Sequence, residues 1–298
     1  MRLDGRRTSG NIFDRRGQGG GGFNFGGGGP GFKIGGFGGV AGLIIVGLIV
    51  WLSGGNPLDI VTGGMQNYTV QSSNPNYVPT QEDEELAHFA SQILAGTEDV
   101  WTRKFNEMGL TYEAPKMVLY TGAVQSGCGG ATAQIGPFYC SADQTIYIDL
   151  SFFKQMEHEM KAGGDFAYAY VIAHEVGHHV QYLLGTLDEA HAQMARLPEA
   201  EANKLSVRTE LQADFYAGVW AHGDNEMFHS IEPGDLEEGL NAASKIGDDY
   251  LQKQARGYEM PESFTHGRSE QRVRWLKRGF DSGNVTYGDT FTPTYTSL

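Results

Sequence analysis

Cysteine is scarce in this chain, whose 298 residues include only Cys128 and Cys140. The two flank a run of small and turn-forming residues, and they lack the short Cys-x-x-Cys spacing of cysteine metal sites. Two cysteines in an oxidising compartment are expected to pair. We therefore predict a Cys128–Cys140 disulfide rather than a cysteine metal site.

An excess of positive charge is also missing. The formal net charge is −14, although the first 33 residues, with six basic and two acidic side chains, carry about +4. A nucleic-acid-binding domain presents a basic face, and an acidic remainder argues against one. We therefore expect no nucleic-acid partner.

The N-terminal part has few aliphatic residues and many glycines, 16 in the first 39 positions. Such a segment cannot bury a core, so we expect residues 1–33 to be disordered. Residues 34–52 then carry no charge over 19 positions, a length that just spans a bilayer core. We predict a transmembrane helix at 34–53 and a linker at 54–80. A cleaved signal peptide fits less well because the run starts late and lacks a clear cleavage site.

Basic residues precede this apolar run: Arg2, Arg6, Arg7, Arg15, Arg16 and Lys33. The positive-inside rule then places the N-terminus in the cytoplasm and the acidic remainder outside. We predict a single-pass membrane protein whose folded domain, residues 81–298, faces the periplasm or the cell exterior.

The five residues from His174 to His178 form a pattern that is typical of a metal site. It lies in an apolar run that predicts a helix, with Asp165 as N-cap and Gly185 just past the end. Two histidines four apart share one helix face and can bind one Zn²⁺, while Glu175 can take a proton from a water molecule. A short pattern of this kind can also occur by chance. Here, however, burying two imidazoles and a carboxylate in so apolar a helix costs free energy unless a metal or a partner group satisfies them.

A third ligand is needed to complete such a site. In one known arrangement of such sites, the third ligand is a His six positions after the second histidine, with a Gly three positions after it. This chain has Gln181 and Leu184 at those positions, which excludes that arrangement. The other takes Glu from a second helix, often with Asp one turn later, and Glu210 and Asp214 fit it within a helical run of about 199–221. We predict that Glu210 binds Zn²⁺ and that Asp214 orients a ligand imidazole. The alternative is an ordinary solvated acidic pair, which the apolar and small neighbours argue against.

Several segments together resemble the bacterial putative neutral zinc metallopeptidase family. They are His174 to Gln181, Thr209 to Asp214, Thr265 to Arg272, Gly136 to Cys140, and the opening residues 1–7 with the glycine-rich tract that follows. The likeness covers nearly the whole chain. It implies a zincin-like fold, peptidase activity and association with a membrane, here the bacterial inner membrane, but no particular substrate.

The remaining pattern predicts an α+β domain that is mainly helical with a small sheet. Alternating residues predict strands at 117–120 and 145–149. Helical segments are expected at 81–108, 151–161, 165–184, 199–221, 235–256 and 269–278.

His266 stands in a loop just before the last predicted helix, near Arg272 and Arg274. A donor or cationic group there could stabilise the oxyanion of a tetrahedral intermediate. Alternatively, His266 caps the helix and the arginines pair with acidic surface groups. Both interpretations stay open at this point.

The sequence thus predicts a zinc-dependent metallopeptidase in which Glu175 is the proton acceptor and a peptide lies extended along an edge strand at 145–149. A non-catalytic, zinc-stabilised membrane scaffold is a second possibility, although it would not require Glu175. A third is a metallohydrolase that acts on non-peptide material, such as a cell-wall amidase.

Overall fold

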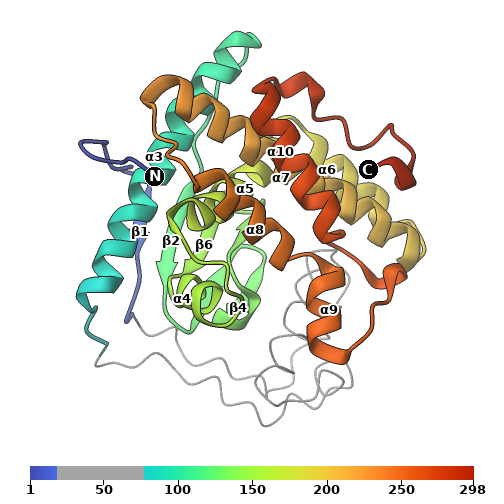
Figure 1. Ribbon diagram of the computed structural model, residues 1–298, viewed down its shortest axis with the longest axis horizontal. Helices are drawn as coiled ribbons and strands as arrows, with labels where there is room; N and C mark the ends of the chain where they lie inside the picture. The colour runs from blue at the N-terminus through green and yellow to red at the C-terminus, as the bar shows by residue number, and fades with distance from the viewer. Residues whose placement is uncertain (19–76) are drawn as a thin grey trace.

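The computed structural model describes residues 1–18 and 77–298. Helices predominate within these ranges (Figure 1), which confirms the predicted mainly helical α+β class. The strands are β1 (Ile12–Asp14), β2 (Lys116–Tyr120), β3 (Ala123–Ser126), β4 (Gly129–Thr132), β5 (Phe138–Cys140) and β6 (Thr145–Asp149). The helices are α3 (Gln81–Glu107), α4 (Ser151–His158), α5 (Asp165–Leu183), α6 (Thr186–Met194), α7 (Glu199–Phe228), α8 (Asp235–Lys245), α9 (Asp248–Arg256) and α10 (Ser269–Ser282).

The main sheet has the order β1-β2-β6-β5, and a separate hairpin joins β3 to β4. β1 and β6 both pair with β2 in parallel, whereas β5 pairs with β6 in the antiparallel sense. The prediction that residues 145–149 form an edge strand is therefore wrong, because β6 has a partner on each side. Within the described residues, β5 is the edge strand next to β6.

The helical body surrounds α5, most of whose side chains are buried. Gly177 lets α7 approach it closely, because a Cβ at that position would lie 2.8 Å from the carbonyl oxygen of Ala213. Gly218 of α7 likewise meets α10, where its Cβ would come within 2.1 Å of the Leu276 carbonyl oxygen. These two close contacts bring α5, α7 and α10 together, with α7 between the other two.

The predicted helix at 151–161 ends at His158 and the one at 269–278 continues to Ser282, and two larger differences have a clear cause. The helix expected at about 199–221 continues to Phe228, because Gly223, which could have ended it, is packed against Val100 of α3. The helix expected at 235–256 is interrupted at Gly247, where a Cβ would lie 2.4 Å from the backbone nitrogen of Ser269. Both differences arise from contacts between segments far apart in sequence.

The prediction of a disordered segment at 1–33 is wrong for residues 1–18. Residues 12–14 form β1 and pair with residues 117–119 of β2. Only three of the 16 glycines that suggested disorder fall in these first 18 positions. This packing joins residues 1–18 to the sheet of the domain, whereas the predicted orientation placed the two on opposite sides of a membrane. Residues 19–33, the predicted span at 34–53 and most of the predicted linker lie outside the described residues.

Within residues 1–18 and 77–298, no helix combines the length and the apolar character needed to cross a membrane. α3 starts at Gln81, and Thr80 caps it by accepting a hydrogen bond from the backbone of Asp83.

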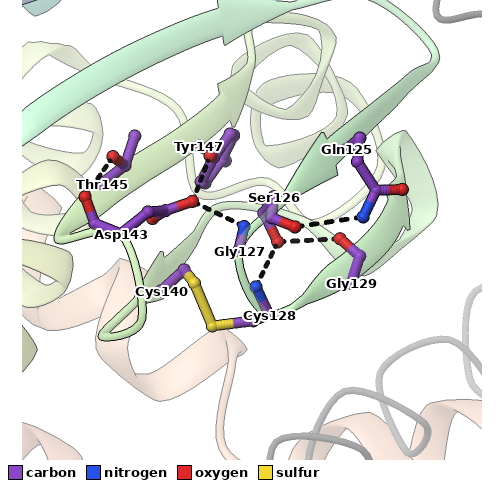
Figure 2. Close-up of a disulfide and its surroundings, with 9 residues drawn as sticks. All are labelled: Gln125, Ser126, Gly127, Cys128, Gly129, Cys140, Asp143, Thr145 and Tyr147. Carbon is purple, nitrogen blue, oxygen red and sulfur yellow. Dashed lines mark hydrogen bonds between the residues drawn. A yellow bond between two sulfur atoms is a disulfide. The ribbon is translucent and has the colours of Figure 1, made fainter.

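The predicted disulfide between Cys128 and Cys140 is present (Figure 2). It ties the β3–β4 hairpin to the end of β5, and Cys140 is fully buried. Asp143 supports the same turn, because its carboxylate accepts hydrogen bonds from the backbone of Gly127 and the hydroxyl of Tyr147. The hairpin is thus fixed to the sheet by a covalent bond and a polar cluster.

Candidate metal centre

The two histidines of α5 project from one face, with ring centroids 4.8 Å apart. Glu210 of α7 lies opposite them. Its Oε2 is 3.1 Å from Nε2 of His174, and its Oε1 is 3.5 Å from Nε2 of His178. The close packing of α7 at Gly177, between the two histidine turns, is what brings Glu210 to this position. One ligand atom from each of the three side chains lies within 4.8 Å of the others.

Asp214, one turn after Glu210, is completely buried behind His174. Its Oδ1 accepts hydrogen bonds from Nδ1 of His174 at 2.8 Å and from the hydroxyl of Tyr170 at 2.6 Å. Arg272 of α10 donates to both carboxylate oxygens, at 2.8 and 2.9 Å. The Asp214 carboxylate is therefore held from three sides and keeps the His174 ring in one orientation.

His178 has a neutral support instead. Its Nδ1 lies 2.9 Å from Oε1 of Gln181, whose amide nitrogen donates to the backbone oxygen of Thr209 and to the side chain of Gln212. Those two acceptors fix the direction of the Gln181 amide, so Oε1 must face His178. Gln181 and Asp214 both accept, and Nδ1 of each ligand histidine therefore carries the donated proton.

When both imidazoles are neutral, as metal ligands must be, the three groups form a cluster of acceptors with no donor between them. With protons on Nδ1, each Nε2 presents a lone pair towards the Glu210 carboxylate. Such an arrangement is favourable only around a positive charge. Two imidazole nitrogens and a carboxylate are also the donor set that Zn²⁺ prefers in catalytic sites. The residues present therefore fit a zinc ion.

The electrostatics of the protein groups point the same way. Burial disfavours a charged imidazole, yet Asp214 and Glu210 outweigh it and raise the pKa of His174 to about 10. Burial also opposes the ionisation of Glu210, but the nearby histidines hold the pKa of its carboxyl well below the usual range. For Asp214, Arg272 and His174 overcome the burial and lower its pKa to about 2. These pKa values apply to the metal-free protein, in which a proton on Nε2 of His174 faces Glu210 at 3.1 Å. A bound cation would take the place of that proton.

Glu175 lies next to His174 on α5 and is 8% exposed. Of the two arginines that the sequence placed near His266, only Arg272 reaches the site. Arg274 pairs with Glu270 on the surface and donates to the backbone oxygen of Leu298. The pairing of Arg272 is with buried Asp214, not with an acidic surface group.

His266 lies in the loop before α10, and that loop rests on the turn of α7 that carries Glu210. Ser206 donates to the backbone oxygen of Thr265 at 2.9 Å, and Gly267 packs against Val207 and Leu211. His266 is not the helix cap, because Arg268 occupies the N-cap position of α10.

Asp248 at the start of α9 holds this loop. Its Oδ2 accepts from the backbone nitrogens of Thr265, His266 and Gly267 at 2.6–2.9 Å, and its Oδ1 lies 3.3 Å from Nδ1 of His266. Burial lowers the tendency of His266 to carry a proton, but Asp248 and Glu210 raise its pKa overall. His266 thus has a carboxylate support like that of His174.

The sequence pattern did not reveal Gln181, Tyr170, Arg272 or Asp248 as supports of the site. Tyr170 and Gln181 could have been found, since they lie four residues before His174 and three after His178 on the same helix. Asp248 and Arg272 carried no comparable signal, because they meet their partners only through tertiary packing.

This arrangement, two histidines and a glutamate beside a further glutamate on the same helix as the histidines, defines a site of the zinc metallopeptidase class. The chain belongs to the putative neutral zinc metallopeptidase family, whose profile matches residues 1–291. The resemblance inferred from the sequence is thereby confirmed.

Relatives share most of this length. The uncharacterized protein YpfJ of Escherichia coli K12 is 49% identical over 291 residues, which cover 98% of this chain and 99% of that protein. The uncharacterized protein Rv2575 of Mycobacterium tuberculosis is 43% identical over 191 residues, or 61% of this chain and 64% of that protein. No solved structure matches the chain.

Proposed function

We propose that the protein is a zinc-dependent peptidase that hydrolyses peptide bonds, with the ion held by His174, His178 and Glu210. The observation that carries this proposal is the convergence of Nε2 of His174, Nε2 of His178 and the Glu210 carboxylate, while Asp214 and Gln181 occupy the Nδ1 atoms of the two histidines. Membership of the family supports the same class of activity.

A bound zinc ion would supply Lewis acidity, polarising the scissile carbonyl and lowering the pKa of a water molecule. Glu175 accepts a proton from the attacking water and delivers it to the leaving amine. The acceptors Asp214 and Gln181 hold a proton at Nδ1 of His174 and His178, which leaves Nε2 of each ring as the atom that would bind the ion.

His266 is assigned to stabilise the developing oxyanion. Its Nδ1 faces Asp248 and the hydroxyl of Thr265, so Nε2 is the nitrogen left to donate to a substrate oxygen. The loop that carries it rests beside Glu210, and Asp248 fixes that loop through three backbone nitrogens. A donor fixed before the reaction stabilises charge without reorganisation.

The substrate would be an extended peptide that pairs with β5, because β5, and not β6 as predicted, is an edge strand within the described residues. β5 borders α5, where the hydroxyl of Tyr139 donates to His179. The disulfide supports a domain that faces an oxidising compartment, outside the cytoplasm. A non-peptide amide substrate remains the second candidate, because the same groups would hydrolyse it.

The test is the Glu175→Gln variant of the full-length protein. We expect zinc content equal to that of the parent and loss of hydrolysis of a proteome-derived peptide library, because only the proton acceptor is removed. Glu189→Gln, an exposed carboxylate on α6, is the matched control and should keep full activity that a chelator abolishes. Peptide hydrolysis by Glu175→Gln at the parental rate would exclude this mechanism.

A further inference from the structure

The first 18 residues are built into the domain that contains the candidate metal centre. Backbone hydrogen bonds tie them to α3, to β2 and to the segment after α7. The nitrogen of Ser9 donates to Ser91 of α3, and that of Arg15 donates to Leu119 of β2. The nitrogen of Arg2 donates to Ser230, just after α7. Figure 1 shows β1 and α3 running along the same side of the molecule, consistent with these bonds.

The N-terminal arginines, on which the predicted membrane orientation was based, form ion pairs within the domain. Arg6 donates to both oxygens of Asp224, at 2.8 and 3.3 Å, and stacks on the ring of Phe228 at 3.6 Å. The side chains of Arg6 and Asp224 are only 11% and 1% exposed. Gly96 of α3 makes room for the pair, because a Cβ there would lie 2.8 Å from Asp224 and 2.9 Å from Arg6. Arg6 and Asp224 thus form a buried, hydrogen-bonded ion pair rather than an exposed charge contact.

The neighbouring residues repeat the pattern. Arg7 pairs with Asp99 at 2.6 Å and with Glu98 at 2.9 Å. The buried carboxylate of Glu98 also accepts hydrogen bonds from Ser9 and Asn11. A basic N-terminal segment is thus matched to carboxylates on α3 and α7 of an otherwise acidic chain.

The end of the first described stretch, residues 1–18, also contacts the start of the second, residues 77–298. Gly17 has a φ of +70°, and a Cβ on it would lie 2.9 Å from the ring of Tyr77 and 3.1 Å from its Cβ. Residues 17 and 77, near the ends of the two described stretches, therefore lie side by side.

We propose that residues 1–18 are a permanent structural part of the domain and that they lie on the same side of the membrane as residues 77–298. One crossing of a bilayer between residue 18 and residue 77 would separate two parts that form one sheet and share buried ion pairs. The N-terminal arginines then act as structural residues, and counting them as flank charges under the positive-inside rule misreads their role.

The test of sidedness uses single cysteines introduced into the full-length protein in intact cells. Thr8→Cys and Asn106→Cys both lie at exposed positions, one in each stretch. A membrane-impermeant maleimide should label both or neither, and permeabilised cells should label both. The parent, whose own cysteines form the disulfide, gives the background. Labelling of one position with protection of the other would overturn the proposal.

A pair of arginine variants of the purified full-length protein separates structure from charge. Arg6→Ala removes the partner of buried Asp224 and should lower the midpoint of thermal unfolding by several degrees. Arg15→Ala removes the same charge from an exposed position and should leave that midpoint nearly unchanged. Equal midpoints for the two variants would also overturn the proposal. Neither experiment depends on hydrolysis, so the proposed peptidase activity can fail independently.

Discussion

His178 and His179 are adjacent in sequence, yet they belong to two opposite environments of α5. His178 faces Glu210 in a cluster of charged groups. His179 is completely buried on another face, where its Nε2 donates to the backbone oxygen of Glu113 and its Nδ1 accepts from Tyr139. Successive side chains on a helix diverge by about 100°, which is enough to separate the two environments.

The difference is clearest in the protonation of buried histidines. Burial lowers the pKa of His179 to about 4, because neutral partners surround it. His174 is also buried, but the carboxylates of Asp214 and Glu210 reverse the effect and raise its pKa to about 10. The same residue type is thus a neutral packing element on one face and a candidate ligand on the other. What decides its role is the presence of fixed anions.

The most direct test of this contrast between the two faces of α5 is to remove the Glu210 carboxylate, which faces His174 and His178. Glu210→Ala should lose zinc on dialysis and bring peptide turnover to background, because two imidazoles alone hold Zn²⁺ in an incomplete site. Zinc stoichiometry after dialysis, measured beside turnover, is the readout. If the variant retains zinc as tightly as the parent, the third ligand is another residue.

A smaller effect is expected at His266, the histidine of the loop before α10. His266→Gln should lower turnover by about 10²- to 10³-fold, the usual cost of losing an oxyanion donor, with unchanged zinc content. His222→Gln is the matched control, since His222 bonds to the backbone of Phe280. Loss of zinc in His266→Gln would instead assign this residue to the metal.

Spacing was sufficient to predict the three side chains that the structure brings together as a candidate metal site. His174 and His178 share a face because they are four apart, and the same spacing places Asp214 behind Glu210. The long helices and the two inner strands were also readable from periodicity. These features depend on local geometry, which a sequence pattern records directly.

The features that sequence missed depend on contacts between distant segments. Arg272 reaches Asp214 only because Gly218 lets α10 pack tightly on α7. β1 was missed because three strand residues stand in a segment whose average composition is glycine-rich. Neither the tight helix packing nor the sheet partner of β1 leaves a periodic signal within its own segment.

A third prediction separates orienting a ligand from being one. Asp214→Asn keeps the shape of the side chain but removes the charge that holds His174 and Arg272. Zinc affinity or turnover should fall by about 10- to 100-fold, the range for a partner that orients a metal ligand. A zinc titration with a competing chelator gives the affinity. An effect as large as that of Glu210→Ala would make Asp214 a ligand in its own right.

The smallest effect on the site is expected from the neutral face of α5. Tyr139→Phe removes the hydroxyl that donates to Nδ1 of His179 at 2.9 Å and leaves that buried nitrogen without its partner. The free energy of unfolding should fall by about 1–3 kcal/mol, the cost of an unsatisfied buried group. Zinc content should not change, because His179 points away from Glu210. Chemical denaturation measures the first quantity and metal analysis the second. A Tyr139→Phe protein that loses zinc but keeps its stability would show that the two faces of α5 are coupled, and the contrast between His178 and His179 would then fail.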